Sequence, residues 1–156
     1  MRDYSGIGFK ALSFKCILEF HLYPKGVIVV YELKSPILGF EEIREVELVE
    51  IDGVFAQIKS KNSPAIGLTL ANPYALREYS FEIPAVIQTL LEITKDSKVR
   101  VFCVVVIQNP IAESRVNFLA PLIFNDDNQT AAQVALLAKD YPNFDIADKI
   151  ENYVKG

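Results

Sequence analysis

Apolar and polar residues alternate along most of the chain from residue 27 onward, the pattern of strands with one buried face. The alternating runs are short and are separated by turn residues. The strands predicted in this way cover residues 27–33, 46–51, 54–58, 65–71, 79–84, 98–108 and 116–125. Short strands at this spacing predict a mainly β fold, arranged as an antiparallel barrel or sandwich.

Three local features refine this picture. Asp52 and Gly53 form a pair typical of a two-residue hairpin turn, so the second and third strands are expected to pair. The apolar phase shifts between Leu48 and Val49, which predicts a bulge. The run 98–108 is apolar on both faces in its middle, so this strand is expected to be buried on both sides.

Helical spacing is confined to short segments. Residues 84–93 have it, and Pro84 suits a first helical turn. Residues 145–154 follow the helical period behind Asp145, a common N-cap residue type, and predict a C-terminal helix. The apolar stripe of that helix consists of Ile146, Ile150 and Tyr153. Residues 130–138 stay open, because their alanines and leucines favour a helix while their place after a polar turn favours a hairpin strand.

Composition and charge narrow the classes of function. The chain has 156 residues, 51% of them hydrophobic and 23% charged, which fits one globular domain with its own core. Its formal net charge of −4 argues against binding nucleic acid through the phosphates, which needs a clustered basic face. The same charge suits a basic protein partner, although a mild acidic excess is also ordinary for solubility.

Nothing in the sequence directs the protein to a membrane or to export. The longest apolar run, 101–107, is far shorter than the roughly 20 apolar residues of a membrane-spanning helix. Lys15 and Glu19 interrupt the N-terminal apolar stretch, and no small-residue cleavage site follows it. Cys16 and Cys103 are the only cysteines and are far apart, which excludes a disulfide framework or a zinc cluster. We therefore expect a cytoplasmic protein.

Groups that drive catalysis are scarce. His21 is the single histidine and precedes the first strand, and Cys103 is expected to be inert inside an apolar strand. The acidic turn 125–129 lacks the following glycine and glutamate of an EF-hand loop. Two acidic pairs flank turns, where solvated carboxylates are expected; they are Glu41-Glu42 and Asp126-Asp127. We expect a binding protein that is not an enzyme and uses no cofactor or metal.

Residues 116–125 read VNFLAPLIFN and resemble the N-L-x-A-P-I-x-[IF]-N signature of the flagellar assembly factor FliW family. Further family-like pieces follow the family's order and separations: SPILGFEE, LANPYAL, EYSFEIP, and AQVAL followed by DYP. The resemblance covers roughly residues 30–154 and implies a strand at AQVAL, within the segment left open above. The matching residues are Pro36, Gly39, Phe40, Asn72, Pro73, Asn117, Ala120, Pro121, Asn125, Gln133, Tyr141 and Pro142.

The proline of the signature has a physical role of its own. Pro121 cannot donate a ladder hydrogen bond, so it is expected at a bulge, a barrel corner or an edge. Asn117 and Asn125 are expected to cap neighbouring backbone, while Leu119 and Ile123 pack a second layer. If the strand alternates without interruption, five residues share the other face: Val116, Phe118, Ala120, Leu122 and Phe124. We expect a corner that defines the fold and not a contact surface.

Both ends depart from the family pattern. Members usually begin close to the first strand, whereas residues 1–26 precede it here, and we expect this extension to be a miscalled start or a poorly ordered tail. Residues 27–156 then form the FliW-like β domain. The predicted C-terminal helix stands where many members have a short basic tail, so contacts made through that tail do not carry over.

The resemblance implies a cytoplasmic, chaperone-like regulator of flagellum biogenesis with two protein partners. One is CsrA, a small dimeric RNA-binding repressor of flagellin translation, and the other is flagellin. In the family, FliW inactivates CsrA, and newly made flagellin takes FliW away again. Linked binding equilibria suffice for this switch, because a partner that binds one form shifts the other by mass action.

Three surfaces are candidates for these contacts. An acidic strand face after residue 40 would steer a basic partner, or it is simply a solvated outer face. The stripe of the predicted C-terminal helix either docks on the barrel or contacts a partner. The segment 72–79 is expected to be an exposed loop with the aromatic and arginine content of binding anchors. The residues are Glu41, Glu42, Glu45 and Glu47, with Glu50 and Asp52 nearby; Ile146, Ile150 and Tyr153; and Tyr74, Arg77 and Tyr79.

Two rival functions stay open. A small-ligand-binding or enzymatic barrel would show a pocket with convergent polar side chains, and a packed interior would count against it. Direct RNA binding needs a basic groove with stacking aromatics, whereas lysine and arginine are dispersed in this acidic chain.

Overall fold

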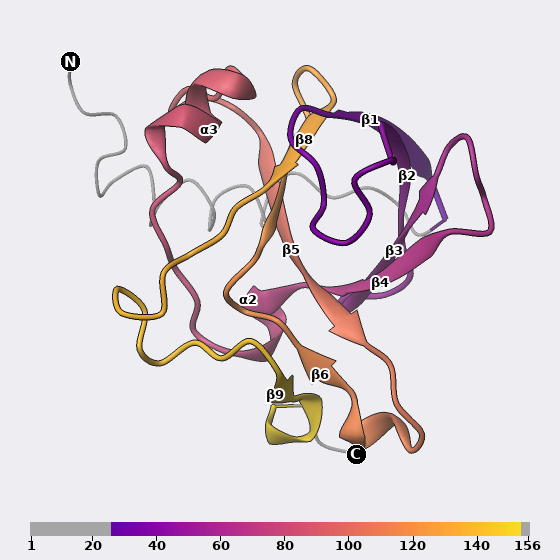
Figure 1. The fold of residues 1–156 in the computed structure, drawn as a ribbon, viewed down its shortest axis with the longest axis vertical. Coiled ribbons are helices and arrows are strands. Elements are labelled where there is room, and N and C mark those ends of the chain that lie inside the picture. The colour runs from indigo at the N-terminus through magenta and orange to yellow at the C-terminus, as the bar shows by residue number, and fades with distance from the viewer. Residues whose placement is uncertain (1–25, 154–156) are drawn as a thin grey trace.

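A computed structural model of the chain describes residues 26–153, and one twisted sheet that curls into a barrel dominates it (Figure 1). Its strands are β1 Ile28–Leu33, β2 Glu45–Glu50, β3 Phe55–Ser60, β4 Gly67–Ala71, β5 Val99–Val106, β6 Arg115–Val116, β7 Leu122–Asn125, β8 Thr130–Gln133 and β9 Asp148–Lys149. The helices are α2 Pro73–Leu76 and α3 Ala85–Leu90, with the 3₁₀ turns η2 Ile111–Glu113 and η3 Ile150–Asn152. The expectations for residues 1–25 lie outside the described residues.

The strand order closes a ring. It runs β4-β3-β2-β1-β8-β7-β5, and a further pairing of β4 with β5 joins its ends, while β6 and β9 extend from β5. All pairings are antiparallel except that of β1 with β8, where Glu32 lies opposite Thr130 and Leu33 opposite Ala131. The mainly β, barrel-like prediction is confirmed. The strand predicted at AQVAL is confirmed only in part, because β8 ends at Gln133 and the last three residues of AQVAL lie beyond it.

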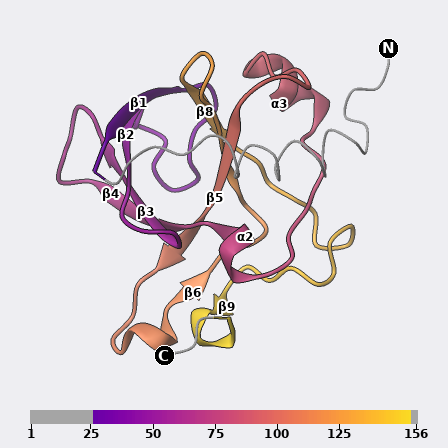
Figure 2. The same cartoon turned by 180° about the vertical axis from the view of Figure 1, so that it is seen from behind.

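The barrel has one packed core inside it and another on its outside. Inside lie residues such as Tyr31, Leu48 and Phe124. Outside, α2, α3 and the segments 77–84 and 134–147 cover β5 on the side away from β1–β4 (Figures 1 and 2). Side chains of β5 enter both cores, Cys103 the outer one and Phe102 the inner one, so the prediction of a strand buried on both sides is confirmed.

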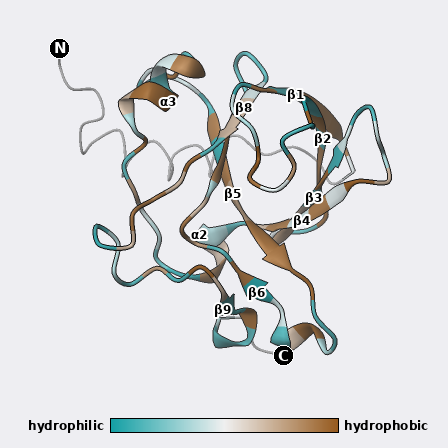
Figure 3. Cartoon of the chain, viewed as in Figure 1, coloured by the Kyte–Doolittle hydropathy of each residue, from teal (hydrophilic) through white to brown (hydrophobic). Residues whose placement is uncertain are grey.

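The hydropathy of the strands reflects these two cores. In Figure 3 most of β5 is hydrophobic, whereas β6 and β9, which extend below the barrel, carry hydrophilic residues. The last residue of β5 is hydrophobic but lies outside both cores, since Val106 is 57% exposed.

The β2–β3 hairpin forms, but two details of its prediction are wrong. Residues 51–54 make the connection, which is longer than a two-residue turn, and the Asp52 carboxylate accepts the backbone N–H groups of Val54 and Phe55 at 2.8 and 2.7 Å. No bulge follows Leu48, since the register with β3 is continuous along β2. Val49 simply points outward and is half-buried.

The predicted strand 79–84 is wrong, although its apolar alternation is real. Tyr79, Phe81 and Ile83 are 5%, 0% and 0% exposed, and all three insert into the outer core. The segment lies across the barrel and pairs with no described strand. Hydrogen bonds that involve side chains hold the segment in place of a strand ladder. The Tyr79 hydroxyl donates to Phe118 O at 2.7 Å, and Glu82 N donates to the Tyr141 hydroxyl at 3.0 Å.

The signature stretch contains the expected corner at Pro121, where β6 has ended and β7 is about to begin. The single shared face is wrong, because Val116 and Phe118 enter the outer core whereas Leu122 and Phe124 enter the inner one. The turn between these pairs rotates the chain and reverses which residues face inward.

The capping role of the signature asparagines is confirmed. Asn117 Oδ1 accepts the N–H of Leu119 at 2.9 Å, and Asn125 Nδ2 donates to Leu91 O at 2.8 Å. Ile123 packs in the outer core as expected, while Leu119 is only half-buried. These bonds fix the corner on both sides of the proline.

The predicted C-terminal helix is wrong. Asp148 and Lys149 instead form β9 against β6, since that strand's free edge offers ladder hydrogen bonds, and only the short turn η3 follows. The three stripe residues separate: Ile146 is 64% exposed, Ile150 is 4% exposed, and Tyr153 packs edge-on against Phe118. The spacing fitted a helix, but it also fits a strand that runs into a turn.

The helix within 84–93 is confirmed as α3, which begins after Pro84. Ile87 and Leu91 are buried, whereas Val86 is 70% exposed. The short helix α2 was not predicted; Asn72 Oδ1 caps it by accepting the N–H of Tyr74 at 3.0 Å.

A charged network lies at one end of the barrel interior. The Arg100 side chain is 2% exposed; its Nε donates to Asp126 Oδ2 at 2.8 Å and its Nη1 to Glu50 Oε2 at 2.8 Å. The Tyr31 hydroxyl accepts from Arg100 Nη2 and donates to Asp126. The expectation of a solvated Asp126 is therefore wrong, because its side chain is 0% exposed.

Burial and the neighbouring charges raise the pKa values of two members of this network, Tyr31 and Arg100. Burial raises the pKa of the Tyr31 phenol far above its usual range, and the Asp126 carboxylate adds to the effect, so the phenol remains a donor. Burial by itself lowers the pKa of Arg100, but attraction to Asp126 and Tyr31 outweighs it and the pKa is raised. Arg100 is therefore a cation at neutral pH.

Arg100→Met removes this cation and leaves the buried Asp126 carboxylate without a counter-charge. Breaking a buried pair in this way costs about 3–5 kcal/mol, so we expect the free energy of unfolding to fall by that amount. Urea denaturation followed by circular dichroism measures it. Lys98→Met, at a neighbouring exposed position, is the control and should change stability by less than about 0.5 kcal/mol. Equal losses in the two variants would contradict the role of the network.

Candidate functional site

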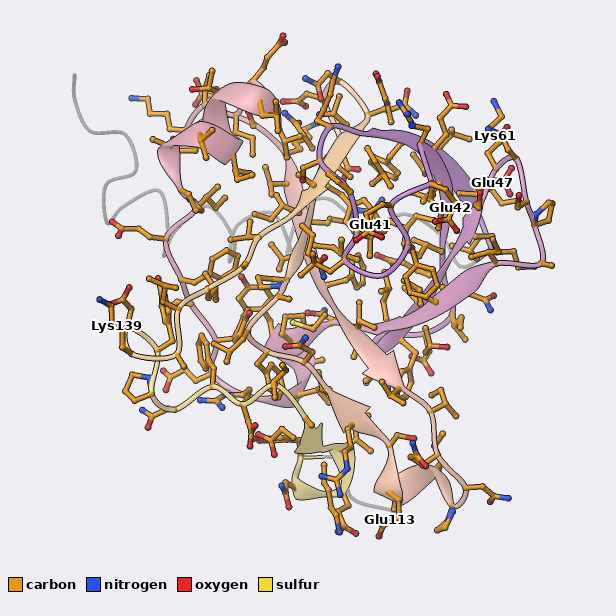
Figure 4. All side chains as sticks on the ribbon, viewed as in Figure 1. Glu41, Glu42, Glu47, Lys61, Glu113 and Lys139 are labelled. Atoms are coloured by element: carbon orange, nitrogen blue, oxygen red, sulfur yellow. The ribbon has the colours of Figure 1, made fainter. Side chains whose placement is uncertain are left out.

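The acidic face predicted on β2 forms on the outside of the barrel. Glu45 and Glu47 are half-buried and point away from the core that receives Val46 and Leu48. Lys61 Nζ lies 3.9 Å from Glu45 Oε1, and Lys59 is the cross-strand partner of Glu47. Glu41, Glu42 and Glu47 lie in the same region of the molecule, with Lys61 near them (Figure 4).

Two acids expected near this face have other roles. Glu50 points inward and pairs with Arg100, and Asp52 caps the β2–β3 connection. Glu41 is fully exposed, and its Oε2 accepts the N–H of Gly39 at 3.0 Å, which lowers the pKa of the Glu41 carboxyl and keeps it charged. Gly39 has φ +89°, a conformation that favours glycine.

Apolar residues continue the acidic face, which the sequence reading missed. Ile28 lies opposite Val49 and Val30 opposite Glu47 across β1 and β2, and these side chains point outward with Glu45. Ile28 is 57% exposed and Ile51, just beyond β2, is 50% exposed. We name this surface the β1–β2 face: Ile28, Val30, Glu32, Glu45, Glu47, Val49 and Ile51. The cross-strand register is the signal that places its acidic and apolar parts side by side.

The segment 72–79 is not an exposed loop, so that expectation is wrong. Tyr79 is 5% exposed and stacks on Phe144 with ring centroids 4.6 Å apart. Tyr74 is half-buried and packs edge-on against Tyr79. Burial raises the pKa of both phenols far above their usual range. Tyr79 is therefore part of the outer core, and Tyr74 packs against it.

Arg77 holds the covering segments together. Its Nη1 donates to Asn143 O at 3.0 Å, and its guanidinium lies 5.0 Å from the ring centroid of Phe144 and 5.5 Å from that of Phe118. Such cation–π contacts add stability when the cation is partly buried. Arg77 thus links α2, the signature corner and the C-terminal segment.

The residues of the family-like pieces meet in space. The Gln133 side chain accepts the N–H of Leu38 at 2.9 Å and donates to Ala120 O at 3.1 Å, so it joins the SPILGFEE loop to the signature corner. Tyr141 stacks on Phe144 with an interplanar angle of 6°. Phe40 packs on the inner core and Pro73 begins α2, while Pro36 and Pro142 are exposed. These residues build the fold more than any one surface.

The barrel interior is filled by the side chains that the structure describes. Its charged groups are those of the Arg100 network, which bind one another, and much of the remainder consists of side chains such as Ile58 and Leu70, which are 2% and 0% exposed. Cys103 is 0% exposed, and burial raises the pKa of its thiol to about 12, so no thiolate nucleophile forms near neutral pH.

Residues 26–153 contain neither a membrane-spanning helix nor a cluster of metal ligands. In this part of the chain no helix is long and apolar enough to span a bilayer. The same residues bring together no group of three or more His, Cys, Asp and Glu side chains able to hold a metal ion.

Comparison with known proteins gives consistent results. The sequence profile of the FliW protein family matches residues 23–145. A flagellar assembly factor FliW 1 of Wolinella succinogenes is 76% identical over 127 residues, which span 81% of this chain and 99% of that protein. A flagellar assembly factor FliW of Helicobacter pylori strain G27 is 54% identical over 126 residues, which span 80% of this chain and 93% of that protein.

The fold agrees with these matches. A crystal structure of the flagellar assembly factor FliW superposes with a TM-score of 0.70, covering 78% of this chain and 84% of that chain at 22% identity. Together with the profile and the sequence identities, this fold shows that the chain belongs to the FliW family of flagellar assembly factors.

Proposed function

We propose that this chain is a non-enzymatic cytoplasmic regulator that binds CsrA, relieves its repression of flagellin synthesis, and exchanges it for flagellin. Family membership carries this proposal. The filled barrel interior supports a protein partner over a small-molecule substrate, because a ligand pocket would need open, convergent polar groups there. Two partners and mass action suffice for the exchange, and no bond needs to be made or broken.

The β1–β2 face is the surface that we assign to CsrA. Its acidic end suits a basic partner and would raise the association rate, while its apolar end supplies area whose burial stabilises the complex. An acidic surface held against an RNA-binding protein would also repel the phosphates of its transcript. The second candidate surface was the apolar stripe of Ile146, Ile150 and Tyr153. Of these three residues, Ile146 is the one that is largely exposed.

Isothermal titration calorimetry of this chain with CsrA from the same cell tests the exchange. We expect saturable binding that is abolished when flagellin monomer is present in excess, because the two partners compete for one pool of this chain. A folded sample that binds neither protein would overturn the proposal. Binding of both proteins at once, without mutual weakening, would overturn the exchange but leave both contacts standing.

Charge reversal tests the assigned surface. The double variant Glu45→Lys and Glu47→Lys should weaken CsrA binding by about tenfold or more and slow association, with the larger effect at low salt. The control is Glu113→Lys with Glu151→Lys, which changes net charge by the same amount. Like Glu45, both control residues lie within 4.0 Å of a lysine, here Lys149 at 3.1 and 3.6 Å. Equal weakening in the two double variants would show a net-charge effect and not a site.

A further inference from the structure

A pocket opens in the loop that joins β1 to β2, next to the end of the β1–β2 face that carries Glu32 and Glu45. Residues 33–36 line it together with Glu41, Ile43 and Arg44, and its volume is about 210 Å³. Pockets for drug-sized ligands hold roughly 300–1,000 Å³, so this one fits a group about the size of one amino-acid side chain. Leu33 and Ile43 supply apolar wall, and the other lining side chains include two cations.

The pocket is built on a loop that is fixed from several directions. Leu33 N donates to Arg44 O at 2.8 Å, and Lys34 N donates to Ala131 O at 2.8 Å. The side chains of Ile37 and Ile43 anchor the loop in the inner core, at 2% and 5% exposure. A ligand therefore meets a pocket that needs little ordering, which reduces the cost of binding.

Arg44 is exposed at the pocket, and its guanidinium is accessible to a ligand. Three other arginines lie in the described part of the chain, and each donates to a protein group: Arg77 to Asn143, Arg100 to Asp126, and Arg115 to Ala147. Within residues 26–153, the Arg44 guanidinium has neither an ion pair nor a hydrogen bond to a side chain or carbonyl. A planar fork of N–H donors left open at a pocket is suited to a carboxylate, which it binds through two parallel hydrogen bonds.

A buried hydroxyl gives a second, independent indication. Ser35 is one of the residues that line the pocket, and its Oγ is buried without a hydrogen-bond partner among the described residues. Buried hydroxyl groups are nearly always paired in folded proteins, so an orphan one that borders a pocket indicates a missing partner. If the Ser35 side chain turned toward the pocket, a carboxylate oxygen held by Arg44 would accept a hydrogen bond from this hydroxyl.

The surrounding charges decide which anion fits. Lys34 adds positive charge, although its Nζ already lies 3.4 Å from Glu32 Oε1. Glu41 is a charged wall, and the neighbouring Glu42 is exposed. These acids disfavour a dianion such as phosphate and tolerate one negative charge held by Arg44.

The geometry points to a binding site for a single carboxylate on a short aliphatic stem, carried by a peptide as an acidic side chain or as its C-terminus. Arg44 holds the carboxylate, Ser35 donates to it, and Leu33 and Ile43 contact the stem. This site does not depend on whether CsrA or flagellin is a partner of the chain.

Nitrogen-15 NMR of the full chain tests the site with four probes. These are N-acetyl-glutamate N-methylamide, its neutral glutamine counterpart, N-acetyl-alanine and inorganic phosphate. We expect saturable shifts of the amides of Lys34, Ser35 and Arg44 with one or both carboxylates, and none with the glutamine compound. The first and third probes distinguish a side-chain carboxylate from a chain terminus. Shifts with phosphate alone, or equal shifts with glutamate and glutamine compounds, would overturn the proposal.

Variants tie the signal to the pocket. Arg44→Gln should weaken carboxylate binding by at least about tenfold, and Arg44→Lys, which keeps the charge but loses the fork, should also weaken it. Lys139→Gln is the matched control: it removes the same charge from an exposed position far from Glu41 (Figure 4) and should change nothing. The spectrum of each variant reports its folding directly. Unchanged binding in both Arg44 variants would overturn the assignment.

Discussion

The constraint that organises this protein is that β5 faces protein on both sides. Val101 and Phe102 are adjacent in sequence, point in opposite directions and are 2% and 5% exposed, so each belongs to a different core. Burying each large apolar side chain is worth roughly 1.5–3 kcal/mol, and a strand that does this on two faces gains twice per unit of length. The rest of the chain supplies the two surfaces that make this burial possible. The ring of strands closes over one face, and α2, α3 and the C-terminal segments cover the other.

This arrangement divides the molecule into a half that stabilises and a half that is free to bind. On the covered side, aromatic residues and Arg77 pack against one another. The ring of Tyr79, for example, contacts four other rings, those of Tyr74, Phe81, Phe118 and Phe144. On the opposite side, β1 and β2 need only their inner faces for the core. Their outer faces carry exposed aliphatic residues and acids, of which Glu32 and Glu45 have only exposed lysines near them. Ile37 and Ile43 anchor the loop between these two strands in the inner core, and the Arg44 guanidinium in this loop has no partner among the described residues.

The sequence predicted the strands well where period-two alternation and pairing agree, as in β1 to β5. It failed where the same alternation serves packing without pairing, as in 79–84, and where a spacing fits two structures, as with Ile150 and Tyr153. The buried pairing of Arg100 with Asp126 could not be predicted from the sequence. Asp126 lies in a polar turn whose side chains are expected to be solvated, and its partner Arg100 is 26 positions away, near the start of a strand whose middle is apolar on both faces. The family resemblance supplied what periodicity left open at β8, but it did not locate a surface. The outer register of β1 against β2 was needed for that.

The one parallel pairing among the described strands, β1 with β8, has a consequence for the order of folding. It joins the first strand of the barrel to the last one of the ring, and Gln129 donates its side-chain amide to Val30 O across 99 positions of sequence. During synthesis on the ribosome, β1, β2 and β3 can pair as a meander long before β8 emerges. Until it does, one edge of β1 stays open, and the Arg100 cation lacks Asp126. Contacts of such long sequence separation form late and slowly. Chain fragments that end before residue 130 would therefore display β1 and β2 on an unsealed sheet, a surface prone to pair with other chains.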